Sequence, residues 1–166
     1  MFKFCSFLMI LSAINQALLG DTLTVGATAP QVSGLDNTGQ MVDLGAELHS
    51  GTTLLFFYPM AMTPGCTQQA CSLRDNWSLL QERAVKVYGI SSDSVESQQK
   101  FLSRHNFPFP LIADTDKRIA KAFGKSRWSR HAYLFHNGKL VWLDTSASTR
   151  QQADDVLQAL DTLDLN

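Results

Sequence analysis

The fold is decided by residues 53–58, TLLFFY, which run directly into residues 59–71, PMAMTPGCTQQAC. The first segment is a continuous run of β-branched, aliphatic and aromatic side chains, which is typical of a strand buried on both faces of a sheet. The second segment begins as a loop, and its Thr-Pro-Gly sequence places Cys66 in the first turn of a following helix. We therefore predict a buried strand that leads into a helix carrying Cys66.

Strand and helix signals alternate along the rest of the chain. A second buried strand is predicted over 84–91, and residues 131–136 and 139–143 predict a hairpin around the turn Asn137-Gly138. Two helices are predicted because their apolar residues fall on one face: Ala70, Leu73, Trp77 and Leu80 in the first, and Ala153, Val156, Leu157, Leu160 and Leu163 in the second. Two further helices are predicted over 93–105 and around 119–123, before Gly124. This order predicts one α/β domain, with a central mixed sheet covered by helices on both faces.

Composition excludes several classes of protein. The 166 residues are 45% hydrophobic and 17% charged, which suits one domain with a normal core. Fourteen basic against fifteen acidic residues give a net charge of -1, so no cationic surplus is available for nucleic acid or an anionic membrane. The four histidines, His49, His105, His131 and His136, lack the spacing of metal ligands, and we expect no metal site.

The first twenty residues differ from the rest of the chain. Lys3 precedes an apolar run over 4–14, and the first acidic residue is Asp21. A membrane span needs about 20 apolar residues, so this shorter run predicts a secretory signal peptide over 1–20 and a mature domain over 21–166. An uncleaved anchor or an apolar tail is the alternative. We expect an exported protein without stable membrane insertion.

Cys66 is the candidate reactive residue. In the first turn of a helix, unpaired backbone N–H groups and the helix dipole favour an anion, so a cysteine there is inclined to be the nucleophilic thiolate. The hydroxyl of Thr63 and nearby N–H groups could orient an electrophilic oxygen or sulfur. The pattern predicts redox chemistry at Cys66.

Cys66 and Cys71 have two other interpretations, a permanent disulfide and part of a metal site. Five helical residues separate the two Cα atoms by about 7.5 Å along the axis, which is more than the roughly 7 Å that a disulfide spans. A bridge therefore requires the helix to unwind, which favours a redox switch over a static disulfide. A metal site would need further ligands that no Cys or His cluster supplies. All three interpretations stay open on these residues alone.

The same residues resemble the active site of the peroxiredoxins, in the bacterioferritin comigratory protein or peroxiredoxin Q branch. Pro59-x-x-x-Thr63-x-x-Cys66 is similar to the general motif, and residues 63–71, TPGCTQQAC, are similar to the version found in this branch. The resemblance extends from residues 25–30 to the final helix and covers nearly all of the expected mature chain. It implies a thioredoxin-like fold.

The resemblance also implies a role for each of five residues. Cys66 is similar to the peroxidatic cysteine, which attacks the O–O bond and becomes a sulfenic acid, and Cys71 to the resolving cysteine, which condenses with it to a disulfide. Thr63 matches the hydroxyl that positions the peroxide, and Pro59 the residue that shields the thiolate. Arg130 matches an arginine that would favour the thiolate and stabilise charge on the leaving oxygen.

The implied function is that of a thiol-dependent peroxidase of the atypical two-cysteine kind. It would reduce hydrogen peroxide and organic hydroperoxides, be regenerated by a thioredoxin-like dithiol reductant, and need no metal or organic cofactor. We also expect a monomer, and the predicted signal peptide indicates the bacterial periplasm. Two other functions remain as alternatives: a thioredoxin-like disulfide oxidoreductase, which would want Cys-x-x-Cys, and a non-enzymatic secreted binding domain stabilised by a disulfide.

Several positions depart from the family pattern or carry no family role. Residues 60–62, Met-Ala-Met, replace charged residues, Gln69 stands where Glu is frequent, and Ala132 replaces Thr. We expect Arg127 to be a solvated surface residue. Four aspartates at strand or helix ends are expected to be caps or turn residues: Asp93, Asp114, Asp116 and Asp144.

Overall fold

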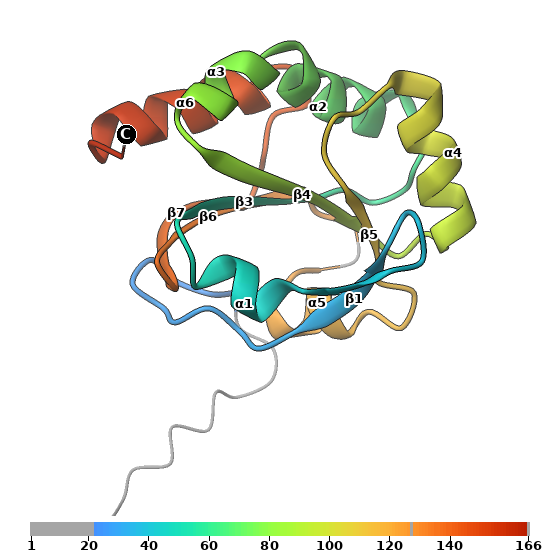
Figure 1. Ribbon diagram of the computed structural model, residues 1–166, viewed down its shortest axis with the longest axis horizontal. Helices are drawn as coiled ribbons and strands as arrows, with labels where there is room; N and C mark the ends of the chain where they lie inside the picture. The colour runs from blue at the N-terminus through green and yellow to red at the C-terminus, as the bar shows by residue number, and fades with distance from the viewer. Residues whose placement is uncertain (1–21, 127, 166) are drawn as a thin grey trace, which may run out of the picture.

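The computed structural model describes residues 22–126 and 128–165, and both the predicted signal peptide and Arg127 lie outside these ranges. Its strands are β1 (Ser33–Asp36), β2 (Met41–Asp43), β3 (Thr52–Phe57), β4 (Val85–Ser91), β5 (Leu111–Ala113), β6 (His131–His136) and β7 (Lys139–Asp144). Its helices are α1 (Leu44–Leu48), α2 (Pro64–Asp75), α3 (Trp77–Glu82), α4 (Val95–His105), α5 (Arg118–Ala122) and α6 (Gln152–Thr162). The elements form one mixed sheet with helices on both faces (Figure 1).

The sheet has the strand order β2-β1-β5-β4-β3-β6-β7. β3 lies inside it, with all six residues buried, and pairs in parallel with β4 and antiparallel with β6. β4 and β5 are also parallel, so the carboxyl ends of β3, β4 and β5 meet at one edge of the sheet. In α/β proteins this edge is where ligands bind.

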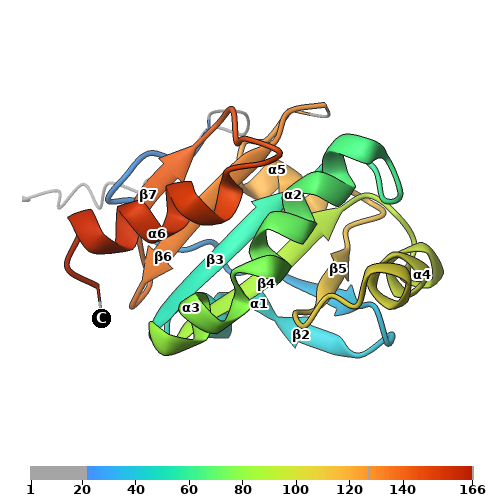
Figure 2. The ribbon, with the colours of Figure 1, turned by 90° about the horizontal axis from the view of Figure 1, so that it is seen from above.

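Two apolar clusters cover the two faces of the sheet. On one face, side chains of α2, α3, α4 and α6 pack against the sheet in a cluster that includes Cys66, Phe101 and Leu160. On the other face, α1 and α5 contribute Leu44, Leu48 and Ile119 to a second cluster. Figure 1 shows these two helical layers above and below the strands, and Figure 2 shows α2 and α6 lying side by side over the first face.

The predicted hairpin, both buried strands and the α/β class are confirmed. The apolar face predicted to belong to one helix is divided between α2 and α3, because the chain leaves helical geometry at Asn76 (φ -106°, ψ 19°). The Asn76 side chain donates a hydrogen bond to the carbonyl oxygen of Ser72 at 3.0 Å. Leu73 and Leu80 reach the same core from separate helices, so the periodicity alone did not reveal the break.

Four short elements were not predicted, namely β1, β2, α1 and β5. They contain three to five residues each, too few for a periodic pattern to stand out. In the described part of the chain, no helix has the length and apolar character needed to cross a membrane.

Candidate active site

Cys66 is the third residue of α2, and its side chain is fully buried. Thr63 is the extended residue that precedes the helix, Pro64 occupies the first helical position, and the first helical hydrogen bond runs from the Thr67 N–H to the Thr63 carbonyl at 2.9 Å. The N–H groups of the first turn have no partner within the helix. The structure therefore confirms the predicted position of Cys66, where the helix terminus favours negative charge on sulfur.

Arg130 provides the positive charge at this site. Its Nη1 donates to Cys66 Sγ at 3.2 Å and to Gln69 Oε1 at 3.1 Å. Gly65 makes this approach possible, because a Cβ atom there would lie 2.8 Å from Arg130 Nη2. Among the described residues, no ion pair joins Arg130 to a carboxylate. Its charge is therefore directed at the sulfur, where it stabilises a thiolate.

Strand pairing explains how residues 64 positions apart come together. β6 lies antiparallel to β3 in a register that places His131 opposite Phe57. Arg130 immediately precedes His131, so it emerges at the edge of the sheet where β3 ends and the loop toward Cys66 begins. The register of β6 on β3 thus places the Arg130 guanidinium next to the start of α2.

Gln69 holds Arg130 from the helix side. It is fully buried, and its Nε2 donates to Oε1 of the equally buried Gln152, at the start of α6, at 2.8 Å. The Nε2 atom of Gln152 has no hydrogen-bond partner in the described part of the chain. Two neutral amides therefore connect Arg130 to α6. The sequence signalled Gln69 only as a departure from the family pattern, and nothing in it indicated Gln152.

The loop between β3 and α2 has an uncommon backbone conformation. Met62 has φ 64°, in the left-handed region that residues with side chains rarely adopt. Thr63 Oγ1 donates to the Met60 carbonyl at 2.9 Å, which leaves the lone pairs of the hydroxyl available to accept a hydrogen bond from a peroxide. Met60 and Met62 are exposed, 47% and 41% respectively. Two apolar side chains therefore face solvent on this loop, where the family pattern has charged residues.

Asp93, predicted to be a cap or turn residue, lies in the bend between β4 and α4 and anchors this loop. Ser94 is the residue that caps α4, through a bond from the Ser97 N–H to its side chain. Asp93 Oδ2 instead accepts from the Ala61 N–H at 2.8 Å and from Ser91 Oγ at 2.6 Å. Adjacent Asp and Ser residues are both good caps, so the local sequence could not show which one faces the loop.

A buried polar network continues from Ser91 behind the loop. Gln98 donates through Nε2 to Ser91 Oγ at 2.9 Å and accepts a hydrogen bond from the Tyr58 hydroxyl. Burial is the main cause that raises the pKa of Tyr58, and the negative charges of Asp93 and Cys66 raise it further. Tyr58 therefore keeps its proton and remains the donor that ties the end of β3 to α4.

Cys71 lies on the same helix as Cys66, is half-buried, and both cysteines are free. Burial raises the pKa of Cys71, which outweighs the opposing effect of Arg74. Cys71 is therefore a protonated thiol at neutral pH while α2 is intact. In the described residues, no group of three or more His, Cys, Asp or Glu side chains is arranged to hold a metal ion.

Comparison with known proteins identifies the family. Residues 25–142 match the model of the AhpC/TSA family. The chain belongs to this family. It is similar to the putative peroxiredoxin bcp of Coxiella burnetii, with 40% identity over 103 residues, 62% of this chain and 68% of that protein. It is also similar to peroxiredoxin Bcp of Escherichia coli, with 38% identity over 112 residues, 68% of this chain and 70% of that protein.

Solved structures agree with this assignment. The peroxidoxin BcpB of Mycobacterium tuberculosis superimposes with a TM-score of 0.77 and 33% identity, over 84% of this chain and 97% of that one. A peroxiredoxin Q of Xylella fastidiosa has a TM-score of 0.80 at 23% identity, over 87% and 99% of the two chains, and shares the fold. The protein is thus a peroxiredoxin of the BCP or peroxiredoxin Q branch with the predicted thioredoxin-like fold.

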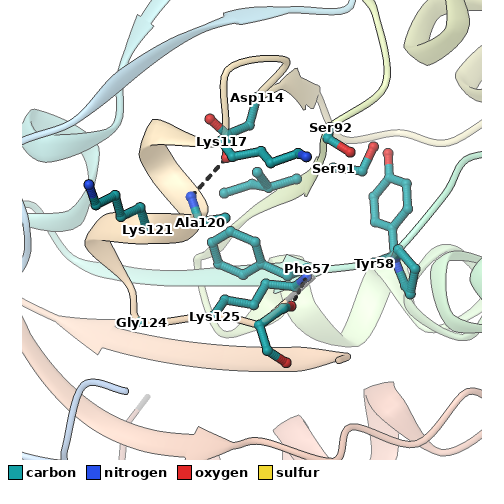
Figure 3. Close-up of a pocket in the computed structure, with 13 residues that line it drawn as sticks. Phe57, Tyr58, Ser91, Ser92, Asp114, Lys117, Ala120, Lys121, Gly124 and Lys125 are labelled. Atoms are coloured by element: carbon teal, nitrogen blue, oxygen red, sulfur yellow. Dashed lines mark hydrogen bonds between the residues drawn. The ribbon is translucent and has the colours of Figure 1, made fainter. Parts of the chain in front are cut away.

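The peroxiredoxin also has a cavity of about 300 Å³ beside Pro59 (Figure 3). Residues at the ends of β3, β4 and β5 line it together with α5 and its flanking loops. Asp114, predicted to be a cap or turn residue, accepts hydrogen bonds at the start of α5 from the N–H groups of Ile119 at 3.0 Å and Ala120 at 2.8 Å. The cavity has no signal in the local sequence beyond the lysines that recur at 117, 121 and 125.

Proposed function

We propose that the protein reduces hydroperoxides through a sulfenic acid on Cys66 and an intramolecular disulfide with Cys71. The hydrogen bond from Arg130 to Cys66 Sγ, at the start of the helix that also carries Cys71, is the observation that carries this function. Family membership supports it over a disulfide oxidoreductase or a binding domain.

In the first step, the Cys66 thiolate attacks the terminal oxygen of the hydroperoxide. An S–O bond forms as the O–O bond breaks, the sulfur is oxidised to a sulfenic acid, and the departing alkoxide or hydroxide takes a proton from water. Arg130 faces the sulfur at 3.2 Å, so its charge can stabilise both the thiolate and the oxygen that gains negative charge. Thr63 and the first-turn N–H groups orient the peroxide, and Pro59 shields the thiolate.

In the second step, Cys71 attacks the sulfenic sulfur, a disulfide forms and water leaves. The helical spacing keeps the cysteines too far apart for this bond, so α2 must unwind locally. Unwinding breaks the hydrogen bond between Gln69 and Gln152 and exposes Cys71, which lowers the cost of its ionisation. A thioredoxin-like dithiol reductant then returns both cysteines to thiols.

Peroxide consumption in cysteine variants tests this function. With a dithiol donor present, Cys66→Ser should consume no peroxide above background. Cys71→Ser should react once per molecule with peroxide and then accumulate oxidised Cys66. Continued turnover by Cys66→Ser would show that the chemistry lies elsewhere.

The specific reductant and the oligomeric state belong to the same proposal. Rates of disulfide reduction by a panel of dithiol proteins and small dithiols would identify the donor class, and a faster reaction with monothiols would argue against a thioredoxin-like donor.

We propose that the protein acts as a monomer. Size-exclusion chromatography with light scattering, in both redox states, should give a mass near 18.4 kDa or below if a leader is removed.

We also propose export to the bacterial periplasm, supported by Lys3 followed by the apolar run over 4–14. Residues 1–20 fused to a reporter that is active only outside the cytoplasm should produce activity. The purified protein should then lack these residues by intact mass. An inactive fusion would refute export.

A further inference from the structure

Helix α4 carries a polar side chain where its apolar face meets the core. Gln98 and Phe101 lie one turn apart and are both fully buried, and Phe101 belongs to the apolar cluster on this face of the sheet. An apolar residue at position 98 would complete that face. A buried amide costs free energy unless it is hydrogen-bonded, so the partners of Gln98 indicate what it contributes.

The amide of Gln98 connects α4 to the ends of three strands. Its Nε2 atom donates to Ser91 Oγ, at the end of β4, at 2.9 Å and to the carbonyl oxygen of Ile112 in β5 at 3.0 Å. Its Oε1 atom accepts from the hydroxyl of Tyr58, which directly follows β3. Figure 3 shows the Tyr58 and Ser91 hydroxyl groups close together, where one amide contacts both. Both N–H donors and the oxygen of this amide are therefore occupied.

Chemistry fixes the direction of these hydrogen bonds. The Ile112 carbonyl can only accept, so the nitrogen of the Gln98 amide, and not its oxygen, faces Ile112 and Ser91. Tyr58 keeps its proton, because burial raises its pKa, and donates it to the amide oxygen. Since Ser91 Oγ accepts from Gln98, its single proton is directed to Asp93 Oδ2, 2.6 Å away. Gln98 thus makes Ser91 a donor to Asp93.

This direction is important for the loop between β3 and α2. Asp93 Oδ2 is the same atom that accepts from the Ala61 N–H at 2.8 Å. Ala61 follows Met60, whose carbonyl oxygen accepts from Thr63 Oγ1 at 2.9 Å. A donor on the Asp93 carboxylate holds it in the orientation that meets Ala61. The anchored loop in turn sets the position of Thr63.

We propose that Gln98 is a positioning residue for the peroxidase reaction. Its amide orients Ser91 and Asp93, which hold Ala61. The loop then keeps Thr63 where it can meet a peroxide. The proposal rests on the peroxidase function and adds to it a residue that acts through its neighbours. Removing the amide should therefore slow oxidation by peroxide more than a reaction of the same sulfur that does not use this loop.

Gln98→Met removes the amide and nearly keeps the length of the side chain. Reduced protein is mixed with hydrogen peroxide or with iodoacetamide, and the rate of Cys66 modification by each reagent is measured. Loss of one hydrogen bond should slow oxidation by about fivefold, whereas alkylation, which needs no bound peroxide, should barely change. Gln99→Met is the matched control, because Gln99 is the exposed neighbour on α4 and its partners are Asn37 and Ser103. This control should keep the wild-type ratio of oxidation to alkylation.

Combination with Asp93→Ala tests the route by which Gln98 acts. If Gln98 acts through Asp93, the double variant should be oxidised no more slowly than Asp93→Ala alone. Independent losses of about fivefold and about tenfold would instead multiply to about fiftyfold. Ser91→Ala is a smaller change in the core that removes the hydroxyl between the two residues. It should reproduce the loss expected in Gln98→Met, so the route can be tested even if Gln98→Met does not fold.

Three results would each overturn the proposal. These are an unchanged ratio of oxidation to alkylation in Gln98→Met or Ser91→Ala, an equal loss in Gln99→Met, and losses that multiply in the double variant. Failure of hydrogen peroxide to oxidise Cys66 in the wild type would overturn the peroxidase function, which is a separate result.

Discussion

Replacing Arg130 by Met should remove most of the activation of Cys66. The guanidinium donates to Cys66 Sγ at 3.2 Å, and Met has a similar length without charge or donor. A hydrogen bond to a charged group contributes about 1.5–3 kcal/mol, which corresponds to a loss of roughly 10- to 150-fold in rate. The larger value applies if the thiolate and the departing oxygen both lose stabilisation, because the thiolate forms before the transition state and the oxygen gains its charge within it.

Two assays on the same variant separate these contributions. Alkylation of Cys66 by iodoacetamide against pH reports the thiolate, and its midpoint should move upward in Arg130→Met. Oxidation by hydrogen peroxide reports the thiolate and the leaving oxygen together, so it should decrease more. Arg118→Met is a matched control, since Arg118 is exposed and pairs with Asp116. Unchanged alkylation and oxidation in Arg130→Met would refute the argument that Arg130 activates the sulfur.

Three further outcomes follow from the site. Asp93→Ala should slow oxidation by peroxide about tenfold, because the Ala61 N–H loses its partner and the loop with Thr63 is less well positioned. Alkylation by iodoacetamide should barely change in this variant. Asp93→Asn should recover most of the rate of oxidation. Amide hydrogen exchange across 67–73 should be faster in the disulfide form than in the dithiol form, and equal protection would contradict local unwinding. Burial raises the pKa of Cys71 in the folded protein, so the folded state is stabilised as long as this thiol keeps its proton. Its contribution to the free energy of unfolding is fully present at neutral pH and decreases as pH rises above about 8.5. Urea titrations of the reduced protein should show a steeper decrease there than those of Cys71→Ser.

Resistance to over-oxidation depends on how easily α2 opens. Gln152→Leu removes the amide that holds Gln69 and should speed disulfide formation, so less Cys66 should carry two added oxygen atoms after turnover at high peroxide. In Cys71→Ser the same doubly oxidised species should accumulate, because capture of the sulfenic acid is absent. Intact mass spectrometry measures both. More over-oxidation in Gln152→Leu than in the wild type would contradict this role of the amide pair.

Local sequence was sufficient for the central features. The run over 53–58 consists of β-branched, aliphatic and aromatic residues, which favours a strand buried on both faces. Thr-Pro-Gly before Cys66 can begin a helix without help from distant residues. The hairpin is equally local, because Asn137 and Gly138 both take the positive φ that such a turn requires. The separation of Cys66 and Cys71 along α2 follows from helix geometry alone.

Other parts of the site exist only because distant segments meet. The register of β6 on β3, with His131 opposite Phe57, decides that Arg130 reaches the sulfur. The family motif named that arginine, but its contact with Gln69 could not be read from the residues around either one. The attachment of Asp93 to Ala61 likewise depends on β4 lying beside β3.

The difference has a physical cause. Propensity, capping and hydrophobic periodicity act over a few neighbouring residues, so they can be recognised in the sequence itself. They were enough to predict the α/β class and the position of Cys66 in the first turn of its helix. Partner choice among buried polar groups depends instead on which atoms the packed sheet brings within hydrogen-bond distance. The Gln69–Gln152 pair, the Asp93 anchor and the lysine-lined cavity arise from packing between segments tens of residues apart, and only the tertiary structure decided them.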